Sequence, residues 1–166
     1  MVHDTLTTLA TLVGARLKSK GLLLSTAESC TGGWVAEAVT AIAGSSEWFE
    51  RGFVTYSNPA KQEMLGVQEA TLVAHGAVSE PTAREMASGA LVHSRAQVAL
   101  SITGVAGPTG GSPDKPVGMV CFAWARQGGA VDSATRHFDG DRESVRRQSV
   151  IYSLQGVIER LDREKT

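Results

Sequence analysis

Residues 22–33 read Leu-Leu-Leu-Ser-Thr-Ala-Glu-Ser-Cys-Thr-Gly-Gly, and the rest of the chain is organised around this stretch. An apolar run passes into hydroxyl side chains and two glycines, and a helical pattern of apolar residues begins directly afterwards at Trp34. This order is typical of a buried strand, a tight turn and the beginning of a helix. In an open α/β sheet, ligands bind at the carboxyl ends of the strands, where a helix N-terminus favours an anion. We therefore expect Ser29 to lie at the centre of a functional site.

The composition is that of an ordinary globular protein. The chain has 166 residues, of which 42% are hydrophobic and 20% charged, and we expect residues 1–166 to form one domain. A net charge of −1 gives no basic field for nucleic-acid binding. No apolar run approaches the roughly 18 residues that span a membrane, and no basic segment of a signal peptide opens the sequence. With only two cysteines, we expect a cytoplasmic protein without disulfides that binds neither nucleic acid nor membranes.

Hydrophobic periodicity predicts alternating strands and helices. The expected strands are residues 22–27, 52–57, 98–103, 117–125 and 130–138. The expected helices are residues 4–19, a helix that follows a turn within 29–43, a short helix from 58, 69–75, a longer one from 79 and 142–163. In the short helix, Asn58 is predicted as the N-cap and Pro59 as the first helical residue. The pattern predicts an α/β fold, a three-layer α/β/α sandwich with a mixed, mostly parallel sheet.

Ser29 is the first candidate for chemistry. A serine between a strand and a helix is well placed for nucleophilic attack, and the N–H groups of Thr31, Gly32 and Gly33 could cradle an oxyanion or a phosphate. The paired glycines favour this interpretation, because glycine weakens a helix and allows close backbone approach to a ligand. The alternative is that Ser29 or Thr31 only caps the helix. Cys30 is a second possible nucleophile, but a buried filler is the preferred interpretation.

A catalytic serine needs a base. The sequence has four histidines without the setting of a catalytic base: His3, His75, His93 and His137. A lysine can act as the base where burial lowers its pKa, and Lys61 is the best placed, at the beginning of a short helix. Tyr56, just before it, is predicted to relay a proton or to orient the lysine. The alternatives are a solvated lysine and a strand-end aromatic.

Residues 103–111, Thr-Gly-Val-Ala-Gly-Pro-Thr-Gly-Gly, form a glycine-rich loop after the most apolar strand. The loop resembles a phosphate cradle but lacks the Gly-Lys-Ser/Thr ending of a P-loop, so binding and a plain turn both stay open. Arg142, Arg146 and Arg147 are candidates for binding an anionic substrate or a partner subunit, and a solvated helix face is the alternative. No spacing of His, Cys, Asp and Glu matches a zinc or calcium site, so we expect no metal.

Four motifs occur in order along the chain. They are Glu28-Ser29-Cys30-Thr31-Gly32-Gly33; Tyr56-Ser57-Asn58-Pro59-Ala60-Lys61 with Leu65-Gly66-Val67; Gly76-Ala77-Val78-Ser79-Glu80; and residues 103–111 through Lys115-Pro116-Val117-Gly118. Together they resemble the CinA C-terminal domain, the competence/damage-inducible protein family, over about residues 5–160. The resemblance implies an α/β/α homo-oligomer, a dimer or higher, that needs no metal or other cofactor.

The resemblance also implies an activity. Such proteins are nicotinamide-nucleotide amidohydrolases, which convert nicotinamide mononucleotide to nicotinic acid mononucleotide and ammonia in the pyridine nucleotide (NAD) cycle. Ser29 matches the position of the nucleophile, and Lys61 and Tyr56 match its supporting residues. Thr103 and the glycine loop, including Gly104 and Gly107, match the substrate-binding loop. Full-length CinA proteins carry a further N-terminal domain, and we expect this chain to be the stand-alone form.

The expected mechanism is acyl transfer. Neutral Lys61, helped by Tyr56, removes the proton of Ser29, which attacks the carboxamide carbon. N–H groups near Gly32 and Gly33 or Gly104 hold the oxyanion. Two other functions stay open. One is a non-catalytic nucleotide-binding regulatory module; the other is a metal-dependent phosphohydrolase, which the missing carboxylate cluster argues against.

Overall fold

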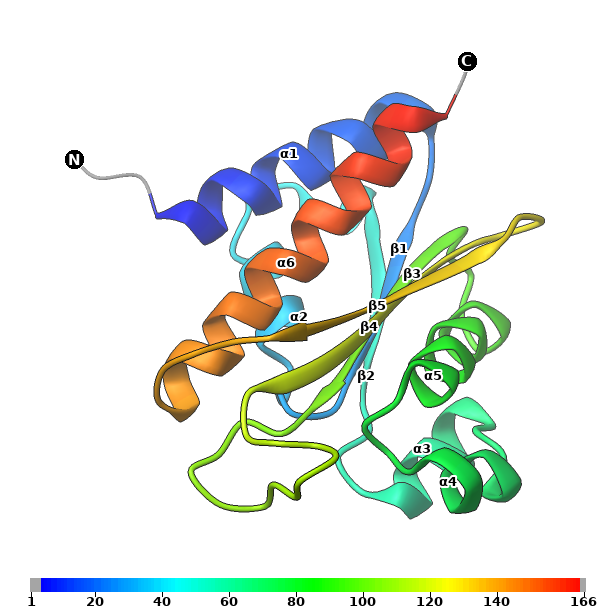
Figure 1. The fold of residues 1–166 in the computed structure, drawn as a ribbon. Helices are drawn as coiled ribbons and strands as arrows, with labels where there is room; N and C mark the ends of the chain where they lie inside the picture. Colours follow the sequence, from blue (N-terminus) through cyan, green and yellow to red (C-terminus); the bar gives the residue numbers. More distant parts are fainter. Residues whose placement is uncertain (1–3, 165–166) are drawn as a thin grey trace.

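The computed structural model describes residues 4–164 and has a five-stranded sheet between two layers of helices (Figure 1). The strands are β1 (Leu24–Glu28), β2 (Phe49–Val54), β3 (Val98–Gly104), β4 (Met119–Arg126) and β5 (Val131–His137). The helices are α1 (Thr5–Lys20), α2 (Trp34–Thr40), α3 (Asn58–Leu65), α4 (Glu69–His75), α5 (Glu80–Val92) and α6 (Arg142–Arg163), with a short 3₁₀ turn η1 (Ser45–Glu47). The predicted α/β sandwich is confirmed.

The sheet is mixed, as predicted, and its strands follow the order β2-β1-β3-β4-β5. β1 lies between β2 and β3 and is parallel to both. β4 is antiparallel to β3, and β5 is antiparallel to β4, so every strand except β4 runs in one direction. The parallel strands β1, β2 and β3 therefore end at the same edge, which we call the carboxyl edge.

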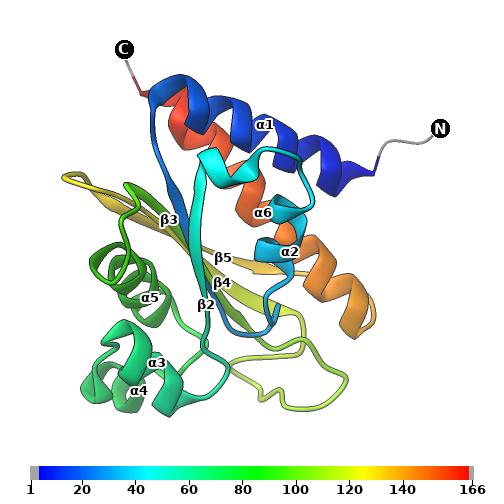
Figure 2. The same ribbon diagram turned by 180° about the vertical axis from the view of Figure 1, so that it is seen from behind.

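The two faces of the sheet are covered by different kinds of helix (Figures 1 and 2). α1, α2 and α6 lie on one face, and α3, α4 and α5 lie on the other. The first face packs large side chains, among them Leu17, Phe122 and Leu154. The core under α5 is rich in alanine, and a β-carbon added at Gly89 would overlap the backbone of Leu65. Small residues thus bring α5 and α3 close together, and α3 carries Lys61.

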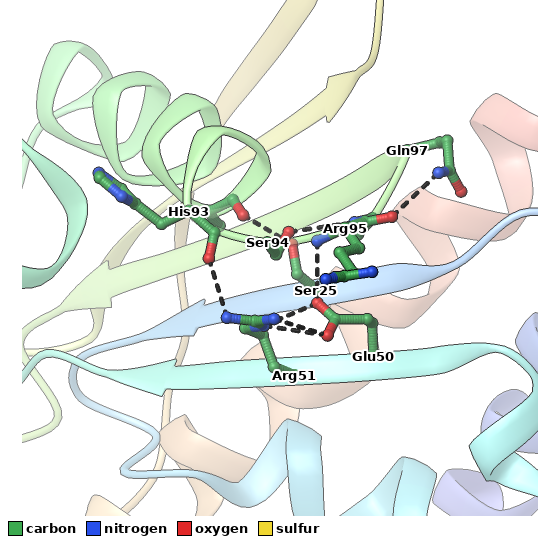
Figure 3. A network of polar contacts seen from close by, with 9 residues as sticks. Ser25, Glu50, Arg51, His93, Ser94, Arg95 and Gln97 are labelled. Atoms are coloured by element: carbon green, nitrogen blue, oxygen red, sulfur yellow. Dashed lines mark hydrogen bonds and ion pairs between the residues drawn. The ribbon is translucent and has the colours of Figure 1, made fainter.

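The amino ends of the strands are held by a polar network (Figure 3). Arg51 donates to the Glu50 carboxylate from Nε at 2.7 Å and to the His93 carbonyl at 3.2 Å. The same carboxylate accepts the N–H of Arg95 at 3.0 Å. We call Glu50, Arg51, His93 and Arg95 the amino-edge network. It ties the edge strand β2 to the connection between α5 and β3.

Several element boundaries differ from the predictions, at both edges of the sheet. The turn and helix predicted over residues 29–43 are present as a turn at 29–33, where Gly32 and Gly33 have φ values of 60° and 104° that no α-helix contains, followed by α2 from Trp34 to Thr40. The strand predicted over residues 52–57 is β2, which begins at Phe49 and ends at Val54. The N-cap of α3 is Ser57, whose hydroxyl accepts the N–H of Ala60 at 3.1 Å. The prediction of Asn58 as the cap was therefore wrong by one residue.

Among residues 4–164, no helix combines the length and the apolar character needed to cross a membrane.

Candidate active site

A pocket of about 240 Å³ opens at the carboxyl edge of the sheet. It collects side chains that follow β1, β2 and β3, together with the first residue of α6. The predicted site residues among its lining are Ser29, Tyr56, Lys61, Thr103, Gly104 and Arg142. Segments far apart in the sequence thus meet at the position where a parallel sheet binds ligands.

A direct polar contact in this pocket joins the side chains of Ser29 and Lys61. The Lys61 Nζ lies 3.0 Å from the Ser29 Oγ. Both residues are buried, with 1% of Lys61 and 7% of Ser29 exposed. Ser29 directly follows β1, and Lys61 lies in the first turn of α3, where the Ser57 cap fixes the direction of the helix. The predicted pairing of these distant residues has the geometry of a nucleophile and its base.

The surroundings of the Lys61 amine favour its neutral form. Nζ donates to the carbonyls of Thr55 at 2.9 Å and Tyr56 at 3.3 Å. Nζ also donates to Ser29 Oγ, and the Ser29 hydroxyl donates to the Tyr56 carbonyl at 3.4 Å. A neutral amine has only two N–H groups and one lone pair, so its lone pair can accept the Ser29 proton once the hydroxyl turns toward Nζ. Burial lowers the pKa of Lys61, and no carboxylate in residues 4–164 forms an ion pair with it. The arrangement can therefore take a proton from the serine.

Tyr56 contributes to this arrangement through its backbone. Its carbonyl holds the lysine, as described, whereas its phenol is exposed and accepts a hydrogen bond from Arg142 at 3.3 Å. Two roles were predicted for Tyr56, to relay a proton or to orient Lys61. In the structure, the Tyr56 carbonyl contacts the Lys61 amine and can orient it. The phenol is hydrogen-bonded to Arg142 and not to Lys61 or Ser29, so this geometry offers no support for a proton relay through it.

Thr31, Gly32 and Gly33 form the turn after Ser29 and do not line the pocket. The Gly32 N–H already donates to the Ser29 carbonyl at 3.0 Å, and the Thr31 hydroxyl donates to Glu28 at 2.6 Å. The Gly32 N–H is thus engaged within the turn, and this geometry gives no support to its predicted role in cradling an anion, which stays a prediction. The two glycines are needed for their positive φ, which other residues rarely adopt.

The two predicted arginines differ in position. Arg142 lines the pocket and donates to the Gly107 carbonyl at 2.8 Å, so Gly107 acts there through its backbone. Arg146 is absent from the lining, and its guanidinium donates to the carbonyls of Cys30 at 3.0 Å and Thr31 at 3.1 Å. Arg146 therefore contacts the turn and not the pocket, so this geometry gives no support to its predicted role as a substrate ligand.

Glu28 is a site residue that the sequence reasoning missed. It is 1% exposed, and its carboxylate accepts the N–H groups of Val35 at 2.9 Å and Ala36 at 3.1 Å as well as the Thr31 hydroxyl. Burial raises the pKa of this carboxyl, and the hydrogen bonds oppose that shift. The carboxylate thus caps α2, a role expected for Ser29 or Thr31. The available signal was an acidic residue that ends an apolar strand pattern four residues before a glycine pair.

The remaining pocket wall comes from the connection before α5. Ala77 and Val78 line the pocket, and the Thr103 hydroxyl donates to the Ala77 carbonyl at 2.9 Å. Both residues belong to a motif noted above, but the sequence indicated no role for them. Thr103 therefore fixes this wall against the end of β3.

The other candidate groups do not have the chemistry of this pair. Burial raises the pKa of the Cys30 thiol to about 12, which keeps it protonated and agrees with its interpretation as a filler. No histidine of residues 4–164 lines the pocket, and His3 lies outside that range. Over the same range, no three His, Cys, Asp or Glu side chains gather as a metal site would require.

Comparison with known proteins agrees with this geometry. The family described as "CinA C-terminal domain" matches residues 6–161. The chain is 57% identical to the nicotinamide-nucleotide amidohydrolase PncC of Escherichia coli K12, over 93% of this chain and 94% of the relative. It is 52% identical to the nicotinamide-nucleotide amidohydrolase PncC of Pseudomonas putida, over 94% of this chain and 97% of the relative. The crystal structure of the competence/damage-inducible protein CihA of Agrobacterium tumefaciens superposes with a TM-score of 0.93 at 46% identity, over 98% of this chain and 99% of that one. The chain therefore belongs to the CinA C-terminal domain family.

Proposed function

We propose that this protein is a nicotinamide-nucleotide amidohydrolase, a hydrolase that converts nicotinamide mononucleotide to nicotinic acid mononucleotide and ammonia. Two relatives that cover almost the whole chain carry that name. The observation that carries the proposal is the 3.0 Å contact between Ser29 and a buried Lys61 without an ionic partner in the described residues. This pair supplies the nucleophile and the base that amide hydrolysis requires.

The proposed mechanism has two halves. Lys61 takes the hydroxyl proton of Ser29 as Oγ attacks the carboxamide carbon. The protonated lysine then gives its proton to the leaving nitrogen, the C–N bond breaks, and ammonia and a Ser29 ester form. In the second half, Lys61 takes a proton from water, which attacks the ester carbon. The proton returns to Ser29 as the acid leaves.

Arg142 is the proposed ligand of the substrate phosphate. It stands at the first position of α6, where the Asp141 side chain caps the helix through the N–H of Ser144 at 2.9 Å. Arg142 is exposed at the pocket and is hydrogen-bonded to the glycine loop and to Tyr56, so its guanidinium faces the opening. A guanidinium is suited to phosphate because it can donate two parallel hydrogen bonds. Thr103 and Gly104 line the same pocket and complete the proposed binding site.

The test is ammonia release from nicotinamide mononucleotide in the presence of EDTA, by the wild type and by Ser29→Ala. We expect turnover that survives EDTA and is lost in the variant, with the thermal unfolding midpoint unchanged. If the folded wild type releases no ammonia, the proposed function fails. Stabilisation by nucleotides without turnover would then favour the regulatory binding module.

The assembly and the compartment stay predictions. We propose a cytoplasmic homo-oligomer built from one domain per chain. Both cysteines are buried and unpaired, which fits a reducing compartment. Light scattering coupled to gel filtration measures the mass in solution, and a monomer would contradict the proposed oligomer.

A further inference from the structure

Residues 29–33, which we call the nucleophile turn, are held by two charged side chains that the mechanism above does not use. One is Arg146 from α6, and the other is Glu28 at the end of β1. The two side chains bind different groups. Arg146 donates to carbonyl oxygens of the turn, whereas Glu28 accepts from a hydroxyl of the turn and from N–H groups of α2. Neither side chain is among the residues that line the pocket.

Arg146 binds two successive peptide groups. Its Nε donates to the Cys30 carbonyl at 3.0 Å, and one terminal nitrogen donates to the Thr31 carbonyl at 3.1 Å. The guanidinium also lies over the ring of Trp34, with the centroid 5.4 Å away. A planar guanidinium can reach both oxygens at once, whereas a lysine ammonium is a point charge without this fixed geometry.

Glu28 is the hydrogen-bond acceptor beside this turn, as Arg146 is the donor. Its carboxylate accepts the Thr31 hydroxyl and the N–H groups of Val35 and Ala36, which lie in the first turn of α2. Because Glu28 directly precedes Ser29, these bonds join the end of β1 to the beginning of α2 across the turn. The Ser29 N–H donates to the Ile102 carbonyl at 2.9 Å, which fixes the nucleophile against β3.

The directions of the carbonyls determine those of the N–H groups. In a trans peptide, the C=O and the N–H of one planar unit point in opposite directions. The Ser29 carbonyl is turned toward the Gly32 N–H, and the Cys30 carbonyl is turned toward Arg146. The N–H groups of Cys30 and Thr31 therefore point away from these partners, and a rotation of either peptide would also displace Ser29.

We propose that Arg146 and Glu28 are positioning residues that fix the nucleophile turn before substrate binds, and that Arg146 acts on turnover and not on the affinity for the phosphate. The kinetic part of this inference rests on the proposed function. Its structural part concerns the turn alone and can be measured without substrate.

The experiment compares Arg146→Leu and Arg146→Lys with Arg147→Leu. Arg147 is a matched control, because it is the next residue of the same helix and its guanidinium binds the Asp4 carboxylate in place of the nucleophile turn. Neither Arg147 nor Asp4 lines the pocket. We expect Arg146→Leu to lower kcat by about 10–100-fold while KM for nicotinamide mononucleotide changes by less than about threefold, since a small displacement of the reacting groups is costly. Arg146→Lys should recover only part of the rate, and Arg147→Leu should match the wild type.

Hydrogen–deuterium exchange of the segment 28–36 is the second readout. Faster exchange in both Arg146 variants, with other segments and the Arg147 variant unchanged, supports the positioning role. The conservative variant Glu28→Gln should act in the same way, because an amide nitrogen cannot accept the N–H groups that the carboxylate holds. Unchanged exchange together with unchanged kcat would overturn the proposal.

A rise in KM at constant kcat would also overturn it, because that result assigns Arg146 to the phosphate. If the wild type releases no ammonia, the proposed function fails, and the exchange of segment 28–36 still decides the positioning role.

Discussion

The charged residues at the two ends of the sheet differ in their burial and in their ionic partners. At the amino edge, Glu50 and Arg51 pair at 2.7 Å and stay partly exposed, with 16% and 45% of their side chains accessible. At the carboxyl edge, Lys61 is 1% exposed and has no ionic partner among residues 4–164. A surface pair contributes little to stability, whereas a buried unpaired amine is costly to hold. The difference indicates that the amino edge serves the fold and the carboxyl edge serves chemistry.

The acidic residues of the two ends show the same contrast. Both Glu50 and Glu28 accept backbone N–H groups. The Arg51 guanidinium lowers the pKa of the Glu50 carboxyl, while burial raises the pKa of Glu28. Glu50 is a charged residue with a charged partner, and Glu28 depends on neutral donors. A polar residue therefore acquires its role from its surroundings and not from its type.

The largest effect is expected at Lys61. Lys61→Ala and Lys61→Arg should each lower turnover by about 10²–10⁴-fold, the usual contribution of a general base. The arginine variant sharpens the comparison, because it keeps a cation that cannot lose its proton. Steady-state ammonia release measures both, with circular dichroism as the control for folding. Substantial activity in Lys61→Arg would show that the lysine is not the base.

A smaller effect is expected at Arg142, which is exposed at the same edge. Arg142→Gln should raise KM for nicotinamide mononucleotide by about 10-fold or more, since it removes a charged hydrogen bond to phosphate. The matched substrate is nicotinamide riboside, which lacks the phosphate. Its KM should therefore change little in Arg142→Gln. Equal losses for the two substrates would place the phosphate elsewhere.

The smallest effect is expected at the amino-edge network. Glu50→Gln should reduce the free energy of unfolding by about 1 kcal/mol or less and leave kcat unchanged, because the pair is partly exposed and lies at the amino edge of the sheet, opposite the pocket. Urea unfolding and the ammonia assay measure the two quantities. A clear fall in kcat would break the proposed division between the edges.

The layers, the strands and the long helices could be predicted from hydrophobic periodicity. The predicted helix 142–163 coincides with α6, and the predicted hairpin of β4 and β5 is present. Periodicity works there because the apolar residues of α6 pack on one face of the sheet, while those of β4 alternate between its two buried faces. The errors lie at the ends of elements: β2 begins at Phe49 and ends at Val54, where residues 52–57 were predicted, and Ser57 caps α3 in place of Asn58. Such local geometry leaves little trace in a hydrophobic pattern.

The site could be predicted only in part. Ser29 and Lys61 stand out by position, and the structure brings them together. Their partners are backbone carbonyls of Thr55 and Tyr56, which have no sequence signature because every residue carries one. The place of Arg146 was not predictable for a related reason, since its contacts reach the nucleophile turn across more than a hundred residues.

Titration of the lysine side chains tests the central claim most directly. Nuclear magnetic resonance of lysines labelled at the ε-carbon follows each amine, and Lys61→Met identifies the resonance of Lys61. We expect the pKa of Lys61 to lie below the ordinary pKa of a lysine, because burial disfavours its ammonium form, and the pKa of Lys18 to lie above that value, because the Glu47 carboxylate stabilises its charge. Turnover should then fall as the pH drops through the pKa of Lys61, where the base becomes protonated. A Lys61 amine that titrates at or above the ordinary value would contradict the account, because Ser29 would then have no base at neutral pH.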